Sequence, residues 1–246
     1  HILPGVIDSQ VHLREPGAEH KEDLETGGRA AVMGGVTAVF EMPNTNPLTT
    51  SDLMLADKVR RGLHRMHCDF AFWVGGTREN AKQVGELERL PGAAGIKVFM
   101  GSSTGDLLVE DDKGVASILK NTRRRAAFHS EDEFRLRDRM HLRVEGDPSS
   151  HPVWRDEIAA LQCTQRLVAI ARKTRSRIHV LHISTAQEID FLRDHKDVAT
   201  CEATPHHLTL SLDEDAALGT LIQMNPPVRG NEHRNGIWNG IGQGIV

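Results

Sequence analysis

Short apolar runs alternate with amphipathic segments along almost the whole sequence, and this alternation restricts the possible folds more than any other feature. Each apolar run has the length and residue types of a buried strand, and each following segment has helical periodicity. Repeated strand–helix units predict a parallel sheet, because a crossover helix returns the chain to the same end of the sheet. The expected strands are Ile2–Asp8, Val36–Met42, Asp69–Val74, Gly95–Met100, Arg125–His129, Arg177–Ile183 and Val198–Ala203.

The number of strand–helix units predicts an α/β fold of the closed (β/α)8 TIM-barrel type, lacking its last strand or strands. A length of 246 residues is close to the roughly 250 residues of such a barrel. We therefore expect one barrel domain over residues 1–246. The sequence opens at His1 without a methionine and stops in what resembles the approach to an eighth strand. We expect an N-terminal β segment and a C-terminal end to lie outside it.

The segments between the expected strands have the periodicity of amphipathic helices. Two of them open with a capping box, formed by Ser130 with Glu133 and by Thr185 with Glu188. The one long irregular connection, Arg143–Trp154, predicts an ordered excursion over the barrel. The expected helices are Lys21–Met33, Asp52–Met66, Arg78–Leu90, Val115–Thr122, Glu131–Met140, Asp156–Thr174 and Ala186–His195.

Composition excludes several classes of protein. A net charge of −4 provides no basic surface for nucleic acid or for an anionic membrane. No apolar run approaches the roughly 18 residues that span a bilayer, and no signal-peptide pattern is present. The three cysteines, Cys68, Cys163 and Cys201, are far apart and odd in number, which predicts reduced thiols. We expect a cytoplasmic protein with a small-molecule substrate.

One expected strand contains a residue that its pattern does not explain. Lys97 lies inside the apolar run Gly95–Met100, which leads into a glycine- and serine-rich loop, Gly101–Gly105. Lysine is rarely buried without a partner, because a low dielectric disfavours the ammonium ion. A buried neutral amine is nucleophilic and can take up carbon dioxide as a carbamate, an anion that can bridge two metal ions. A structural ion pair with a carboxylate is the alternative interpretation.

Histidines make the metal interpretation the stronger one. His12 follows the first expected strand, His129 ends the fifth, and His182 lies near the end of the sixth. Active sites of (β/α)8 barrels lie at the carboxyl ends of the strands. A single histidine at a strand end is usually structural, but three of them together with Lys97 predict a metal centre. Asn44, after the second strand, falls at the same end.

Sequence motifs then indicate a family. Residues 4–17 (PGVIDSQVHLREPG) resemble the first-strand signature of dihydroorotases in the amidohydrolase superfamily. Allantoinases and hydantoinases share the metal ligands, but Arg14 with Glu15-Pro16-Gly17, and Asn44, favour dihydroorotase. Further matching blocks follow in the family's order: Met42–Thr45, Gly95–Phe99, Phe128–Asp132, His179–Ser184, Thr204–Leu208 and Asn225–Arg229.

The resemblance implies a zinc centre with one or two Zn²⁺ ions. Lys97, carbamylated, would bridge the two metals. His129 and His182 would bind the second metal, and His12 the first. In such a centre a hydroxide activated by zinc attacks the cyclic amide carbonyl of the substrate, which makes Lys97 and His12 the expected catalytic residues.

The resemblance also implies how the substrate is held. Arg14 and Asn44 match residues that hold the substrate carboxylate, and a planar guanidinium suits a bidentate contact with that group. Asn225 matches a position that hydrogen-bonds the pyrimidine ring. The structural alternatives are a surface ion pair for Arg14 and a turn for Asn44.

Two departures from the family pattern concern the metals. The family's first-strand pair is His-x-His, but here it is Gln10-Val11-His12, and an amide oxygen is a poorer zinc ligand than imidazole. We therefore expect Gln10 to bind the first metal weakly or not at all. The family's strand-eight aspartate, which ligates metal and shuttles the proton, has no counterpart in these 246 residues.

Three functional hypotheses remain at this point. The leading hypothesis is a zinc-dependent dihydroorotase that interconverts dihydroorotate and N-carbamoyl-L-aspartate in pyrimidine biosynthesis. The second, supported by Gln10, is a catalytically inactive dihydroorotase-like subunit that is a structural partner of aspartate transcarbamoylase. The third is a related amidohydrolase acting on hydantoin, allantoin or a dihydropyrimidine. A homodimer is also compatible with the sequence.

Overall fold

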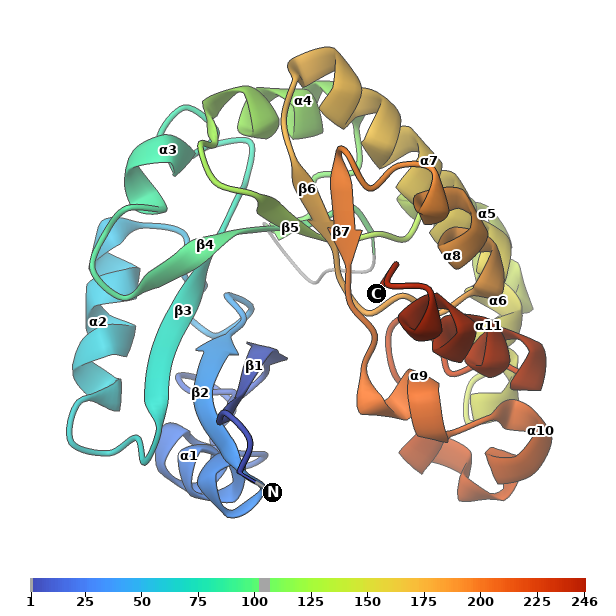
Figure 1. The fold of residues 1–246 in the computed structure, drawn as a ribbon, viewed down its shortest axis with the longest axis horizontal. Coiled ribbons are helices and arrows are strands. Elements are labelled where there is room, and N and C mark those ends of the chain that lie inside the picture. Colours follow the sequence, from blue (N-terminus) through green and yellow to red (C-terminus); the bar gives the residue numbers. More distant parts are fainter. Residues whose placement is uncertain (1, 102–106) are drawn as a thin grey trace. The chain divides into compact units, whose positions relative to one another are not determined.

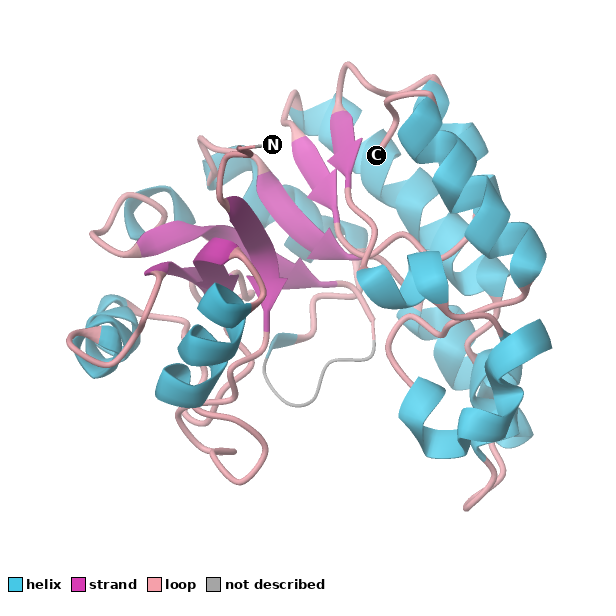
Figure 2. Ribbon diagram, turned by 60° about the horizontal axis from the view of Figure 1, so that its bottom comes forward, coloured by secondary structure: helices cyan, strands magenta, loops and turns pink. Residues whose placement is uncertain are grey.

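The computed structural model describes residues 2–101 and 107–246, so His1 and most of the expected Gly101–Gly105 loop lie outside the described residues. Strands and helices alternate, and the paired strands are parallel, as predicted (Figure 1, Figure 2). The chain divides into two compact units, His1–Val98 with Asn121–Ala126, and Phe99–Lys120 with Ala127–Val246. The single barrel domain over residues 1–246 stays a prediction.

The first unit is a parallel sheet with the strand order β1-β2-β3-β4. Helix α1 packs against β2, and α2 packs against β3. Leu24 of α1, Leu55 of α2 and Phe72 of β3 have at most 1% of their surface exposed and belong to the core between helices and sheet. The elements are β1 (Val6–Val11), α1 (Leu24–Met33), β2 (Val36–Glu41), α2 (Asp52–Gly62), β3 (Asp69–Gly75), α3 (Val84–Leu87) and β4 (Ala93–Phe99).

The second unit has three strands and most of the helices. Strands β6 and β7 pair in parallel, with Ile178 opposite Ala199, and the Leu181 N–H donates to the Phe128 carbonyl of β5 at 3.1 Å. The elements are α4 (Asp112–Asn121), β5 (Ala126–His129), α5 (Glu133–Arg139), η2 (Met140–Leu142), η3 (Pro148–Ser150), α6 (His151–Trp154), α7 (Glu157–Thr174), β6 (Ile178–Val180), α8 (Ala186–Arg193), β7 (Ala199–Cys201), α9 (Pro205–Thr209), α10 (Leu212–Asp215), η4 (Ala216–Ile222) and α11 (Asn231–Gly242).

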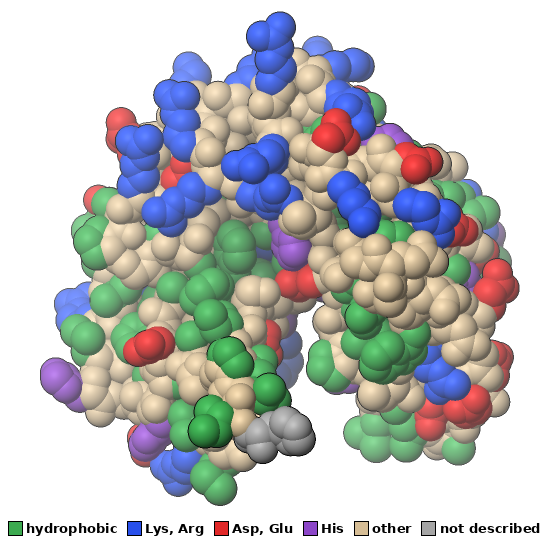
Figure 3. Space-filling view, in the orientation of Figure 1, with side chains coloured by type: hydrophobic (Ala, Val, Ile, Leu, Met, Phe, Trp, Pro, Cys, Tyr) green, Lys and Arg blue, Asp and Glu red, His purple; other side chains and the backbone are tan. Residues whose placement is uncertain are grey.

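Two elements of the first unit differ from their predicted bounds for physical reasons. The strand expected at Ile2–Asp8 runs from Val6 to Val11, because Val11 still pairs with Glu41 of β2 whereas residues 2–5 are exposed. Apolar side chains are visible on the exposed surface of this unit (Figure 3). The helix expected over residues 78–90 shrinks to α3, because the Asn80 side chain accepts from the Thr77 N–H at 2.8 Å and donates to two carbonyls, forming a turn instead.

The two predicted capping boxes have different outcomes. Thr185 is the N-cap of α8, and its hydroxyl accepts from the Glu188 N–H at 3.1 Å, as predicted. The box of Ser130 with Glu133 is wrong. Asp132 caps α5 instead, whereas the Ser130 hydroxyl lies 2.9 Å from the Thr164 hydroxyl. A carboxylate two residues closer to the helix satisfies the free N–H groups better than the serine does.

Strand β4 confirms the expectation that a polar residue is buried within an apolar run. Ile96, Val98 and Lys97 each have at most 1% of their surface exposed. None of the described helices is long and apolar enough to cross a membrane. The arrangement is therefore an α/β fold with buried parallel strands, and the closed eight-stranded barrel is not confirmed.

Candidate functional site

His12 and Asn44 meet at the carboxyl ends of β1 and β2. The Met42 N–H donates to the Val11 carbonyl at 2.9 Å, which holds the two strand ends together. His12 Nδ1 lies 2.9 Å from Asn44 Oδ1. An amide oxygen only accepts, so the imidazole donates through Nδ1 and keeps its lone pair at Nε2. Burial and the nearby Arg14 cation lower the pKa of His12 to about 3, so the ring is neutral and suited to bind a metal.

Gln10 lies on β1, two residues before His12, which follows the strand directly. Its Oε1 atom is buried and accepts no hydrogen bond from the residues that the structure describes. Leaving a buried amide oxygen unpaired is unfavourable. A cation or an N–H donor at this position would satisfy it. The expectation that Gln10 binds the first metal weakly or not at all stays a prediction.

Arg14 has a fixed backbone and an unpaired charge. It adopts a left-handed conformation, with φ of 65°, which is uncommon for any residue other than glycine. Its guanidinium forms neither an ion pair nor a hydrogen bond with any side chain in residues 2–101 or 107–246. A half-buried, unpaired guanidinium is suited to bind an anion such as a carboxylate.

The loop that follows Arg14 is anchored on both sides. The buried Glu15 carboxylate accepts from two Arg65 nitrogens, at 2.7 and 3.0 Å, and from the Leu24 N–H at 3.1 Å. The loop is also in contact with the segment after Asn44, because the Asn46 N–H donates to the Pro16 carbonyl at 2.9 Å. At Gly17, with φ of 102°, a Cβ atom would lie only 2.6 Å from Asn46.

Lys97 is the last site residue of the first unit. Its side chain is buried on β4, where its Nζ donates to the Val98 carbonyl at 3.3 Å. Lys97 also lowers the pKa of His12, which means that its charge acts on that imidazole. A lysine ammonium has no free lone pair and binds no metal, so only a modified Lys97 can be a ligand.

His129 and His182 meet in the second unit. His129 ends β5, and His182, two residues after β6, has a φ of 41°. Nδ1 of His129 and Nε2 of His182 lie 3.1 Å apart, with the rings nearly perpendicular. Two imidazole nitrogens on one tetrahedral zinc ion, each about 2.05 Å from it, lie roughly 3.3 Å apart. The two nitrogens therefore have the separation of a ligand pair.

Glu131 sets the orientation of His129. His129 Nε2–H donates to Glu131 Oε2 at 2.7 Å, which leaves the lone pair on the Nδ1 that faces His182. Burial alone raises the pKa of Glu131, but the Arg155 guanidinium and His129 outweigh it and hold the pKa at about 2. Arg155 forms a buried ion pair with this carboxylate. Such a carboxylate–histidine arrangement is typical of metal sites.

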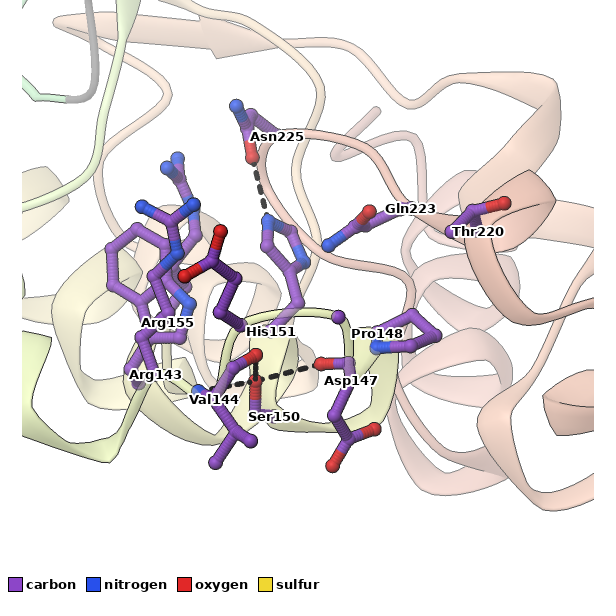
Figure 4. A pocket seen from close by; sticks show the side chains of 13 residues that line it. Arg143, Val144, Asp147, Pro148, Ser150, His151, Arg155, Thr220, Gln223 and Asn225 are labelled. Atoms are coloured by element: carbon purple, nitrogen blue, oxygen red, sulfur yellow. Dashed lines mark hydrogen bonds between the residues drawn. The ribbon is translucent and has the colours of Figure 1, made fainter.

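A cavity of about 450 Å³ opens in the second unit beside this network (Figure 4). His151 Nε2–H donates to Asn225 Oδ1 at 2.9 Å, so the amide nitrogen of Asn225 remains available as a donor. Burial and Arg155 lower the pKa of His151 to about 4, which keeps the ring neutral. Arg143 and Arg155 line the same cavity together with Glu145 and Asp147, so it offers hydrogen-bond donors and charges of both signs.

The structure brings together some of the predicted residues and not others. It pairs His12 with Asn44, and His129 with His182. Asn225 instead lines a cavity that contains none of the predicted metal ligands. Among the described residues no group of three His, Cys, Asp or Glu side chains has the geometry of a metal site. His129 and His182 have the separation of two ligands of one metal ion.

The sequence analysis missed the residues that orient these ligands. Glu131 lies within the block Phe128–Asp132, but no role was assigned to it. Arg155 and His151 lie at the end of the irregular connection, 24 and 74 residues from their partners Glu131 and Asn225. The only available signal was the presence of charged and imidazole side chains in a segment that was expected to be ordered.

Comparison with known proteins agrees with this geometry. The dihydro-orotase-like family matches residues 1–64. The dihydroorotase of Methanothermobacter thermautotrophicus is 33% identical over 237 residues, covering 95% of this chain and 53% of that protein. The dihydroorotase of Halobacterium salinarum is 34% identical over 252 residues, covering 100% of this chain and 57% of that protein. The chain is thus similar to dihydroorotases over almost its whole length.

Solved structures support the fold. The L-hydantoinase (dihydropyrimidinase) from Arthrobacter aurescens superimposes with a TM-score of 0.90 at 23% identity, covering 99% of this chain and 56% of that one. The chain thus has the fold of that hydantoinase. It spans about half the length of the curated relatives that it matches.

Proposed function

We propose that the protein containing this chain is a zinc-dependent dihydroorotase, which interconverts dihydroorotate and N-carbamoyl-L-aspartate. The proposal includes a single (β/α)8 barrel domain in which residues 1–246 supply most of the strands. The observation that carries the substrate assignment is Arg14. Its guanidinium is half-buried and forms no ion pair with a described side chain, and it lies beside the neutral His12–Asn44 pair. Such a cation binds a substrate ring that bears a carboxylate. Neither hydantoin nor allantoin carries a carboxylate.

In this proposal the metal is held by His129, His182, His12 and a carbamylated Lys97. When bound, zinc lowers the pKa of a coordinated water and polarises the amide carbonyl. The chain's own residues prepare this site. Glu131 accepts a hydrogen bond from Nε2–H of His129, so the lone pair of that ring is on Nδ1. Asn44 accepts a hydrogen bond from Nδ1–H of His12, so the lone pair of this ring is on Nε2.

Substrate recognition is assigned to Arg14, Asn44 and Asn225. Arg14 donates two parallel hydrogen bonds to the substrate carboxylate. Because His151 occupies the amide oxygen of Asn225, this side chain presents only its N–H groups, which suit a ring carbonyl. Asn44 keeps its own N–H groups available while its oxygen holds His12.

The test is a hydrolysis assay on the purified, zinc-loaded protein, together with metal analysis. We expect dihydroorotate to be hydrolysed faster than hydantoin, allantoin or dihydrouracil. A faster reaction with any of these three neutral rings would contradict the role of Arg14. Gel filtration tests the expected homodimer, and co-purification tests aspartate transcarbamoylase as a partner.

Gln10 supports a second candidate, a catalytically inactive subunit. Its buried amide oxygen stands where the family has an imidazole, so the first metal has one ligand fewer. We expect Gln10→His to raise the zinc content from about one towards two per chain. Activity that appears only in this variant would favour the inactive subunit, whereas full occupancy of both sites in the unaltered protein would show that Gln10 is an adequate ligand.

A further inference from the structure

The reaction proposed above leaves one buried ion pair of the first unit without a role. Lys58 of α2 and Glu41 of β2 lie with Nζ and Oε2 2.6 Å apart, and their side chains are only 2% and 1% exposed. Burying two charges is unfavourable, and a pair of apolar residues often stabilises a core equally well. Stability alone therefore does not explain why a lysine and a glutamate occupy these positions.

Lys58 contacts the segment that carries Asn44. Its Nζ donates to the Met42 carbonyl at 3.2 Å and lies 5.0 Å from the centre of the Phe72 ring. Only Pro43 separates Met42 from Asn44. The contact fixes the backbone just before Asn44 leaves the end of β2.

Glu41 contacts the segment that carries Arg14. It is paired in register with Val11 at the end of β1. Burial raises the pKa of Glu41, while Lys58 and the backbone N–H of Arg14 oppose that shift. Val11 lies three residues before Arg14, whose backbone is left-handed, so the register contact links Glu41 to the segment that carries Arg14.

We propose that the Glu41–Lys58 pair is a positioning element that sets the spacing between Arg14 and Asn44, and thereby determines how well the protein selects a substrate that carries a carboxylate. This inference rests on the proposed function. The pair contacts both segments at once. Glu41 is in register with Val11, three residues before Arg14, and Lys58 donates to the Met42 carbonyl, two residues before Asn44. A displacement of about 1 Å in such a pair of contacts is enough to weaken recognition by up to roughly 100-fold.

The experiment compares dihydroorotate with its methyl ester, which lacks the negative charge. The measured quantity is the ratio of kcat/KM for the acid to kcat/KM for the ester, together with zinc content and melting temperature. The test variant combines Glu41→Gln with Lys58→Met, so that no charge is left buried without a counter-ion. A matched control combines Asp197→Asn with Arg172→Met, which removes an ion pair whose side chains are 61% and 46% exposed.

We expect the acid-to-ester ratio to fall at least about tenfold in the test variant, with zinc content and ester hydrolysis unchanged. The control should keep the ratio of the unaltered protein. Glu41→Gln with Lys58→Gln keeps an N–H donor for the Met42 carbonyl, so it should recover part of the ratio, an effect that a purely structural role does not predict. Glu41→Gln alone, which removes the charge that is paired with Lys58, is the comparison if the double variant does not fold, and its ratio must also fall.

A folded test variant with an unchanged ratio would overturn the positioning role. Failure of the proposed function has a different signature, because the unaltered protein would then show no preference for the acid over the ester, or would hydrolyse neither.

Discussion

The histidines at the strand ends of the two units have different hydrogen-bond partners. In the first unit His12 is oriented by a neutral amide, and the nearby Arg14 guanidinium and Gln10 oxygen have no partner among the described side chains. In the second unit His129 is oriented by Glu131, which is itself neutralised by Arg155. A carboxylate behind an imidazole strengthens that ring as a metal ligand. An unpaired guanidinium suits an anion instead.

This difference suggests that the two units bind different groups. The second unit is arranged for a cation, because two imidazole nitrogens converge and a buried carboxylate supports one of them. The first unit is arranged mainly for an anionic substrate. Substitutions at the histidine pair of the second unit should therefore lower metal affinity, whereas substitution of Arg14 in the first unit should raise the Michaelis constant.

The largest expected effect is the loss of one converging imidazole. His182→Ala leaves His129 without its partner, and we expect zinc to be lost from the protein and hydrolysis to fall below about 0.1% of its original rate, since metal activation of water is removed. Metal analysis after dialysis and a hydrolysis assay measure both. The exposed His20→Ala is the matched control, and a His182→Ala protein that retains zinc would disprove the ligand role.

Arg14→Ala should act on the substrate alone. Removing a charged hydrogen bond costs about 1.5–3 kcal/mol, which corresponds to a roughly 10- to 150-fold rise in KM for dihydroorotate. Zinc content should not change. Arg60→Ala, which removes an exposed arginine from an i,i+3 pair with Asp57, is the control. If Arg14→Ala lowered zinc content and left KM unchanged, the proposed division between the two units would be wrong.

Glu131→Gln should weaken metal binding without abolishing it. The amide still accepts a hydrogen bond from His129, but it no longer carries the charge that strengthens the ligand, so we expect zinc affinity to fall about 10- to 100-fold. Competition with a chelator of known affinity measures this without reference to activity. Glu25→Gln, at an exposed i,i+4 pair, should leave the affinity unchanged.

The smallest effect concerns stability at low pH. His207 is buried, it donates to the Pro226 carbonyl at 3.1 Å, and its pKa is lowered to about 4, mainly by burial. The unfolded imidazole binds a proton near pH 6.5 and the folded one only near pH 4, so stability decreases as pH falls through this interval. His207→Gln should make the melting temperature less dependent on pH between 7 and 4.5. If the melting temperature of His207→Gln depended on pH as strongly as that of the unaltered protein, protonation of His207 would not be a cause of the loss of stability at low pH.

The sequence was most informative where the pattern is local. The alternation of strands and helices, the buried Lys97 and the Thr185 cap depend on neighbouring residues, and the structure confirms them. Histidines at strand ends led to the pairing of His129 with His182, because parallel strands place equivalent ends together.

The parts that could not be predicted depend on distant partners. His151 and Asn225 are 74 residues apart, and no periodicity links them. Asp132, rather than Ser130, caps α5, because the competition between two nearby side chains is decided by packing, in which Ser130 is turned towards Thr164. The support that Glu131 gives to His129 likewise depends on Arg155, whose position follows from an irregular segment.

The close approach of Gly17 to Asn46 has a consequence for engineering. The two loops that carry Arg14 and Asn44 are locked by a backbone hydrogen bond, and they leave no space for a Cβ atom between them. A replacement loop with any residue other than glycine at position 17 would clash with Asn46. Redesign of substrate preference in this scaffold therefore requires both loops to be exchanged as one cassette.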